Sequence, residues 1–129
     1  MSEDQVPDDV RRFLLSGVLT VPHVEAILQL RAERNRAWDA DRLATRLYVR
    51  AGVAQQVLAD LNAIGIAAAE GQPPTYRYAP GTAELADLLD RLVTAYSTHL
   101  VAVTAIIHRA EPRKALLFAE AFRIRKDSR

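Results

Sequence analysis

DADRLATRLYVRAGVAQQVLADLNAIGIAAAEGQPPTYRYAP, residues 39–80, decides the fold of this chain. Apolar residues recur at helical spacing in two segments, Leu43, Ala44 and Leu47 in the first and Ala54, Val57, Leu58 and Leu61 in the second. Only Tyr48 and Val49 lie at the corner between them, which predicts a sharp turn. Gly65 suits a helix end, and residues 66–69 and 75–78 can pair as a hairpin. The stretch therefore predicts helix, turn, helix and β-hairpin.

This stretch resembles the winged helix-turn-helix of MarR-like and PadR-like transcriptional regulators. LATRL at 43–47, the apolar turn residue Val49 and LNAIGI at 61–66 match the pattern of that superfamily without a gap. Two features depart from it: Tyr48 replaces a Gly or small residue, and the second helix starts RAGV where DNA-reading members tend to carry Ser, Arg, Thr or Lys. The resemblance implies a mostly α protein with a small β-hairpin wing, of the α+β class, and a cytoplasmic DNA-binding regulator of bacterial type.

Length and composition predict one compact domain overall. Within it, the resemblance implies a winged-helix part over 1–80, and the apolar pattern that follows predicts a helical dimerisation region over 81–129. The 129 residues include 17 Lys and Arg against 16 Asp and Glu, and no Cys, which excludes disulfides and thiolate metal sites. The acidic N-terminus does not read as a secretory signal. No apolar run reaches the length of about 18 residues that a membrane span needs, so we expect no membrane partner.

Outside the central stretch, we expect helices over 7–16 and 21–31, a short strand over 36–38 and a last helix over 113–124. Trp38 directly precedes a helix that Asp39 can cap. We therefore predict that Trp38 is structural and buried at the junction between strand and helix.

A long helix is predicted over 82–109, about 42 Å at 1.5 Å per residue. Its heptad seam consists of Leu85, Leu89, Leu92, Tyr96, His99, Val103 and Ile106. Because a small domain does not cover that length alone, the seam predicts a homodimer through these seven residues. For His99 two interpretations stay open: a core or interface histidine with a hydrogen-bond partner, or a symmetric metal or pH site at the dimer seam.

The sequence favours binding over catalysis. It contains no Gly-rich phosphate loop, nucleophile elbow or metal motif, and its three histidines lie in separate places. We expect no enzyme activity, no catalytic residue, no metal and no cofactor.

The expected partners are a second copy of the chain and duplex DNA. Arg50, Gln55 and Gln56 are placed to reach base edges, and Arg46 and Arg77 to reach phosphates. Residues 39–80 nevertheless carry four arginines against four carboxylates. The alternative is therefore a winged helix that binds a protein and not DNA. A basic tail, with six Lys and Arg against three acids over 110–129, either touches phosphate or is simply solvated.

Overall fold

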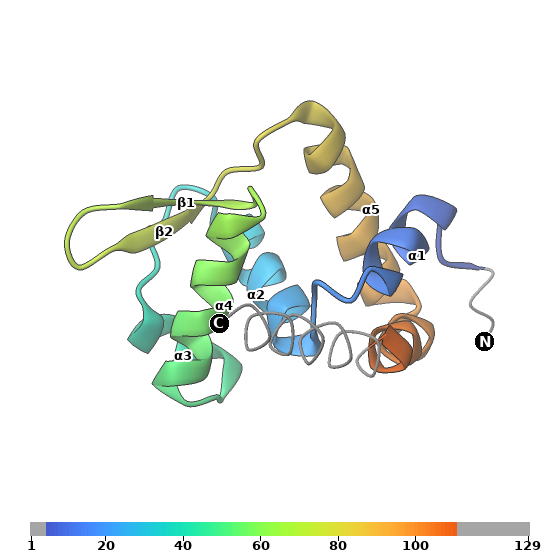
Figure 1. The fold of residues 1–129 in the computed structure, drawn as a ribbon, viewed down its shortest axis with the longest axis horizontal. Helices are drawn as coiled ribbons and strands as arrows, with labels where there is room; N and C mark the ends of the chain where they lie inside the picture. Colours follow the sequence, from blue (N-terminus) through green and yellow to red (C-terminus); the bar gives the residue numbers. More distant parts are fainter. Residues whose placement is uncertain (1–4, 111–129) are drawn as a thin grey trace, which may run out of the picture. The chain divides into compact units, whose positions relative to one another are not determined.

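The computed structural model describes residues 5–110 (Figure 1). Its elements are α1 (Asp8–Leu15), α2 (Val21–Ala32), α3 (Ala40–Leu47), α4 (Ala51–Ala63), β1 (Ala67–Glu70), β2 (Thr75–Tyr78), α5 (Ala83–Thr98) and a further helix over 100–110. The chain is thus mostly helical with a small two-stranded antiparallel sheet, as predicted. No helix within residues 5–110 has the length and apolarity needed to cross a membrane.

The chain divides into two compact units. The described residues of one are 5–20 and 94–110, and the other is Val21–Val93. In the first unit α1 is amphipathic and buries Val10 and Leu14 completely. The sequence led us to expect one compact domain with a division near residue 80. In the structure, α1 instead falls in the same compact unit as residues 94–110.

The second unit is built around α3, a three-residue turn and α4. Asp39 caps α3, since its Oδ1 accepts a hydrogen bond from the backbone N–H of Arg42 at 2.7 Å. The helix ends at Tyr48, which has a left-handed backbone conformation. The N–H of Val49 then donates a hydrogen bond to the carbonyl of Ala44. The two helices pack against each other. Their buried side chains are Leu43, Ala44, Ala54, Val57, Leu58 and Leu61.

The hairpin follows directly from the end of α4. Gly65 adopts φ +86°, which lets the chain reverse into β1. β1 and β2 pair from Ala67 opposite Tyr78 to Glu70 opposite Thr75. Trp38 extends this sheet by two backbone hydrogen bonds of 2.8 Å with Tyr76. Its side chain is fully buried, which confirms that Trp38 is structural.

The long C-terminal helix was predicted wrongly. α5 ends at Thr98, and a separate helix begins at residue 100 after His99. The Thr98 hydroxyl donates to the carbonyl of Thr94 at 2.8 Å. The Thr104 hydroxyl makes the same bond to Leu100 inside the next helix, so this bond by itself does not account for the break. The apolar pattern continues across this break, so spacing alone predicted one helix of 28 residues.

Much of the predicted dimer seam is buried within the single chain. The buried members are Leu89, Leu92, Tyr96, Val103 and Ile106. Leu85 and His99 are partly exposed, and His99 Nδ1 is buried without a hydrogen-bond partner among residues 5–110. A partner chain is therefore not needed to cover these five residues, and the homodimer stays a prediction. The predicted helix over 113–124 lies outside the described residues.

Candidate nucleic-acid interface

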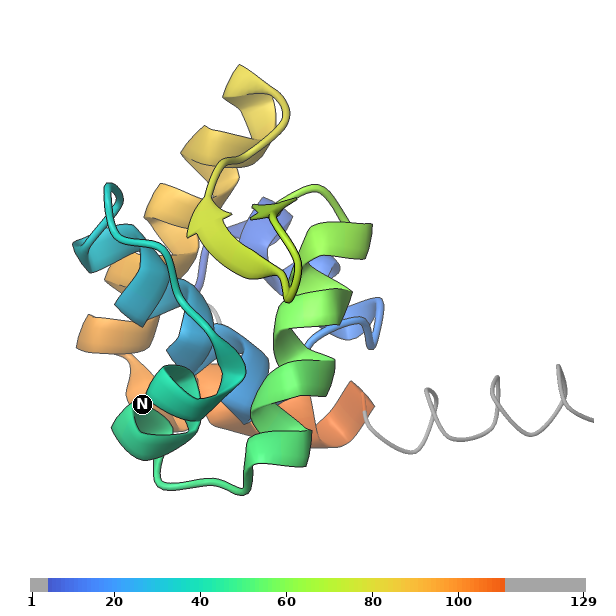
Figure 2. The ribbon, with the colours of Figure 1, turned by 90° about the vertical axis from the view of Figure 1, so that its left-hand side faces the viewer.

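The N-terminal half of α4 is an exposed surface. Arg50 and the residues after it up to Gln56 are exposed, apart from the buried Ala54. The C-terminal half carries Val57, Leu58 and Leu61, which hold the helix on the core. Figure 2 shows this helix beside α3 and the hairpin, all within the same unit. The sequence thus places the buried face at one end of α4 and leaves the first turns open to a partner.

Two of the five predicted contact residues are free to bind a ligand. The side chains of Arg50 and Gln55 make no hydrogen bond or ion pair with any other residue in the part of the chain that the structure describes. Arg50 is the N-cap residue of α4, and Gln55 lies one turn further on. The long side chains of Arg50 and Gln55 therefore extend from the same end of α4 without hydrogen bonds or ion pairs to the described residues.

Arg46 has a structural role that the sequence did not indicate. Its Nη1 donates to Gln29 Oε1 at 2.8 Å and lies 3.2 Å from Glu33 Oε2, both on or just after α2. Its guanidinium also lies 5.1 Å from the centroid of the Trp38 ring. Arg46 therefore joins α2, α3 and the buried tryptophan, and its charge is partly neutralised before any phosphate approaches.

Each of the other two predicted contact residues has one carboxylate partner. Arg77 Nη1 lies 3.7 Å from Glu70 Oε1 across the hairpin, and both side chains are well exposed. An exposed pair of this kind contributes at most about 1 kcal/mol, so Arg77 can exchange it for a phosphate. Gln56 Nε2 donates to Asp60 Oδ1 at 2.9 Å.

Asp60 also holds a buried histidine. Its Oδ2 lies 2.8 Å from Nε2 of His23, whose side chain is almost fully buried in α2. The pair ties α2 to α4, and the bond to Gln56 extends it to the exposed helix surface. The residues of the pair are 37 positions apart, so no local sequence signal could have identified it.

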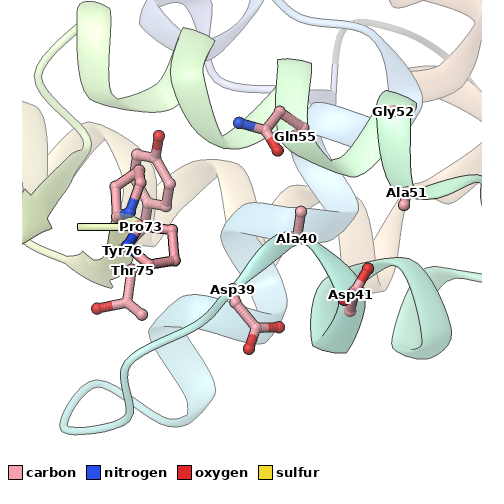
Figure 3. Close-up of a pocket in the computed structure, with 10 residues that line it drawn as sticks. Asp39, Ala40, Asp41, Ala51, Gly52, Gln55, Pro73, Thr75 and Tyr76 are labelled. Carbon is pink, nitrogen blue, oxygen red and sulfur yellow. The ribbon is translucent and has the colours of Figure 1, made fainter. Parts of the chain in front are cut away.

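A cleft lies next to the start of α4 (Figure 3). Its volume is about 440 Å³, and its lining comes from the start of α3, the start of α4 and the hairpin: Asp39, Ala40, Asp41, Ala51, Gly52, Gln55, Pro73, Pro74, Thr75 and Tyr76. Figure 3 shows Gln55 across the cleft from Ala40 and Asp39. Two carboxylates, those of Asp39 and Asp41, belong to this lining, and no basic side chain of the described residues does. The cleft could not be predicted from the sequence, because it forms only where three separate segments of the chain pack together.

No protein-family model, curated protein or solved structure matches the chain. The arrangement of α3, the turn, α4 and the hairpin therefore carries the functional conclusion.

Proposed function

We propose that this protein is a DNA-binding regulator and that residues 21–80 form a winged helix-turn-helix. In this proposal α3 and α4 are the two helices of the motif, α4 reads the DNA, and β1 with β2 is the wing. One observation carries it: the first two turns of α4 are exposed and offer Arg50 and Gln55 without internal partners. The order of the elements and the pairing of Trp38 with the hairpin also support it.

The proposed contacts follow from the geometry of such motifs. The N-terminal part of the second helix enters the major groove, where Arg pairs with guanine and Gln with adenine through two hydrogen bonds. Gly52 has no heavy atom within 4 Å of the position that a Cβ would take, so the backbone is open to close approach. Gln56 would read bases with its orientation set by Asp60, and Arg77 would leave Glu70 to contact the DNA backbone.

Affinity would depend on few charges. Arg46 already lies against Glu33, and two carboxylates line the nearby cleft. Because each neutralised phosphate adds to the salt dependence of binding, the slope of affinity against salt should be shallow. Two copies of the chain would double the number of contacts, which is why the proposal includes a homodimer. The large apolar side chains exposed on the helix over 100–110 are Leu100 and Val101, and contact between copies would use them.

The test is a selection from random duplexes at low salt with the purified protein. We expect an enriched motif, and Gln55→Ala should relax the preference at one base pair by about 1–3 kcal/mol. Arg50→Ala should weaken binding more than Arg12→Ala, a matched control at an exposed arginine of α1. A selection that enriches no sequence and retains no DNA would refute the proposal.

A second candidate function is a protein-interaction module, and the acidic cleft specifically favours it. Asp39 and Asp41 would meet a basic group, while Pro73, Pro74 and Tyr76 provide an apolar wall. Asp41→Lys separates the two candidates. Reversing this charge should strengthen DNA binding through added attraction to phosphate, and it should abolish retention of a basic protein partner in a pull-down.

A further inference from the structure

Tyr48 has a conformation that its residue type does not favour. It lies in the turn between α3 and α4 with φ 59° and ψ 44°, and it is the single non-glycine residue with positive φ among residues 5–110. The ends of α1 and α4 also need a positive φ, and there the chain uses Gly17 and Gly65. Glycine adopts this conformation without the steric clash that a Cβ introduces. The turn after α3 would therefore be more stable with glycine.

Packing does not compensate for this strain. The Tyr48 side chain is 95% exposed, and it makes no hydrogen bond or ring contact within the described part of the chain. An exposed aromatic ring in a left-handed turn thus contributes nothing to the fold that can be identified. Residues with a strained backbone conformation cluster at active sites and ligand-binding sites.

We propose that Tyr48 is a DNA-contact residue whose hydroxyl donates a hydrogen bond to a backbone phosphate. This inference rests on the proposed DNA-binding function. Tyr48 precedes Arg50 by two residues, so its ring leaves the chain at the same end of α4 as that free cation. A phenol O–H is a hydrogen-bond donor. Tyrosine hydroxyls are among the groups that contact phosphates and fix the register of a protein on duplex DNA.

The surroundings favour a phosphate over an apolar protein surface. Arg46 and Arg50 flank Tyr48 in sequence. Besides Tyr48 in the turn, one large apolar side chain among residues 5–110 is exposed nearby, that of Val53 on α4, at 41%. Two such side chains are too few for the buried apolar centre that a protein interface requires, whereas one hydroxyl beside one arginine suffices for a phosphate contact.

The experiment measures DNA affinity and melting temperature on the same variants. The probe is a fluorescently labelled duplex of random sequence, and affinity is read from fluorescence anisotropy at low salt. Tyr48→Phe removes the hydroxyl and keeps the ring and the strain. We expect it to weaken binding by about tenfold or more, the loss of one hydrogen bond to a charged group, without a change in melting temperature. Tyr48→Gly should weaken binding at least as much and should raise the melting temperature by about 2–8 °C.

Opposite changes in affinity and stability for Tyr48→Gly are a result that a purely structural role does not produce. The inference is overturned if the wild type binds the duplex and both variants bind within about twofold of it. It is also overturned if Tyr48→Gly weakens binding while Tyr48→Phe does not, because the ring and not the hydroxyl would then make the contact. Absence of wild-type binding to any duplex would refute the proposed function itself, and the inference with it.

Discussion

Replacing Trp38 by alanine should remove a large part of the stability of the unit that contains α3, α4 and the hairpin. The ring is fully buried, its backbone forms two hydrogen bonds of 2.8 Å with Tyr76, and Arg46 lies over its face. Substitution of a buried tryptophan by alanine costs about 3–5 kcal/mol in transfer free energy and cavity formation. Small domains have free energies of unfolding of about 5–15 kcal/mol, so the variant should lose a substantial part of its stability.

Trp38→Phe is the matched control. It keeps an aromatic ring beneath Arg46 and removes an indole N–H that is buried without a hydrogen-bond partner in residues 5–110. Losing this unsatisfied donor offsets part of the lost volume, so we expect a cost below about 2 kcal/mol. Urea unfolding followed by far-UV circular dichroism measures both variants, because it does not depend on the replaced fluorophore. A loss below about 1 kcal/mol for Trp38→Ala with an unchanged m-value would show that the ring is not a core residue.

Three further outcomes are expected. Gly52→Ala should stabilise the protein by about 0.4–1 kcal/mol, because Gly52 is helical with open space at its Cβ position. Gly65→Ala should destabilise the protein, because φ at Gly65 is +86°. Thermal melts in which both variants shift the melting temperature in the same direction would contradict this. Burial and then the Asp90 carboxylate raise the pKa of Tyr78, so the unfolded chain loses this proton near pH 10 while the folded chain keeps it. Stability should fall as pH rises above about 10, and Tyr78→Phe should reduce that fall in pH-dependent urea titrations; an equal fall in the variant would contradict the assignment. Light scattering at micromolar concentration should give about twice the mass of one chain, and a monomer mass would reject the homodimer.

The central stretch was predictable from sequence because its signals are local. The apolar spacing in α3 and α4, the cap at Asp39 and the glycine at Gly65 each act within one turn of chain, and the structure shows all of them. The hairpin followed from the same kind of evidence, since its two strands flank a connection of only four residues between Glu70 and Thr75.

Features that depend on packing between distant segments were not predictable. Arg46 was expected to face phosphate, but α2 brings Gln29 and Glu33 against it. The link from His23 through Asp60 to Gln56 likewise exists only once α2 packs on α4. The end of α5 was missed for a different reason: the apolar pattern continues past Thr98, so the spacing of apolar residues contains no signal for a break there.

The proposed function is tested most directly by a map of the surface that duplex DNA contacts. Amide chemical shifts of the labelled protein are followed by NMR while a duplex from the selection is added. We expect the largest changes in residues 48–56 and at the hairpin connection and β2, residues 71–77. Changes confined to α1 and the helix over 100–110, or none at saturating duplex, would contradict it.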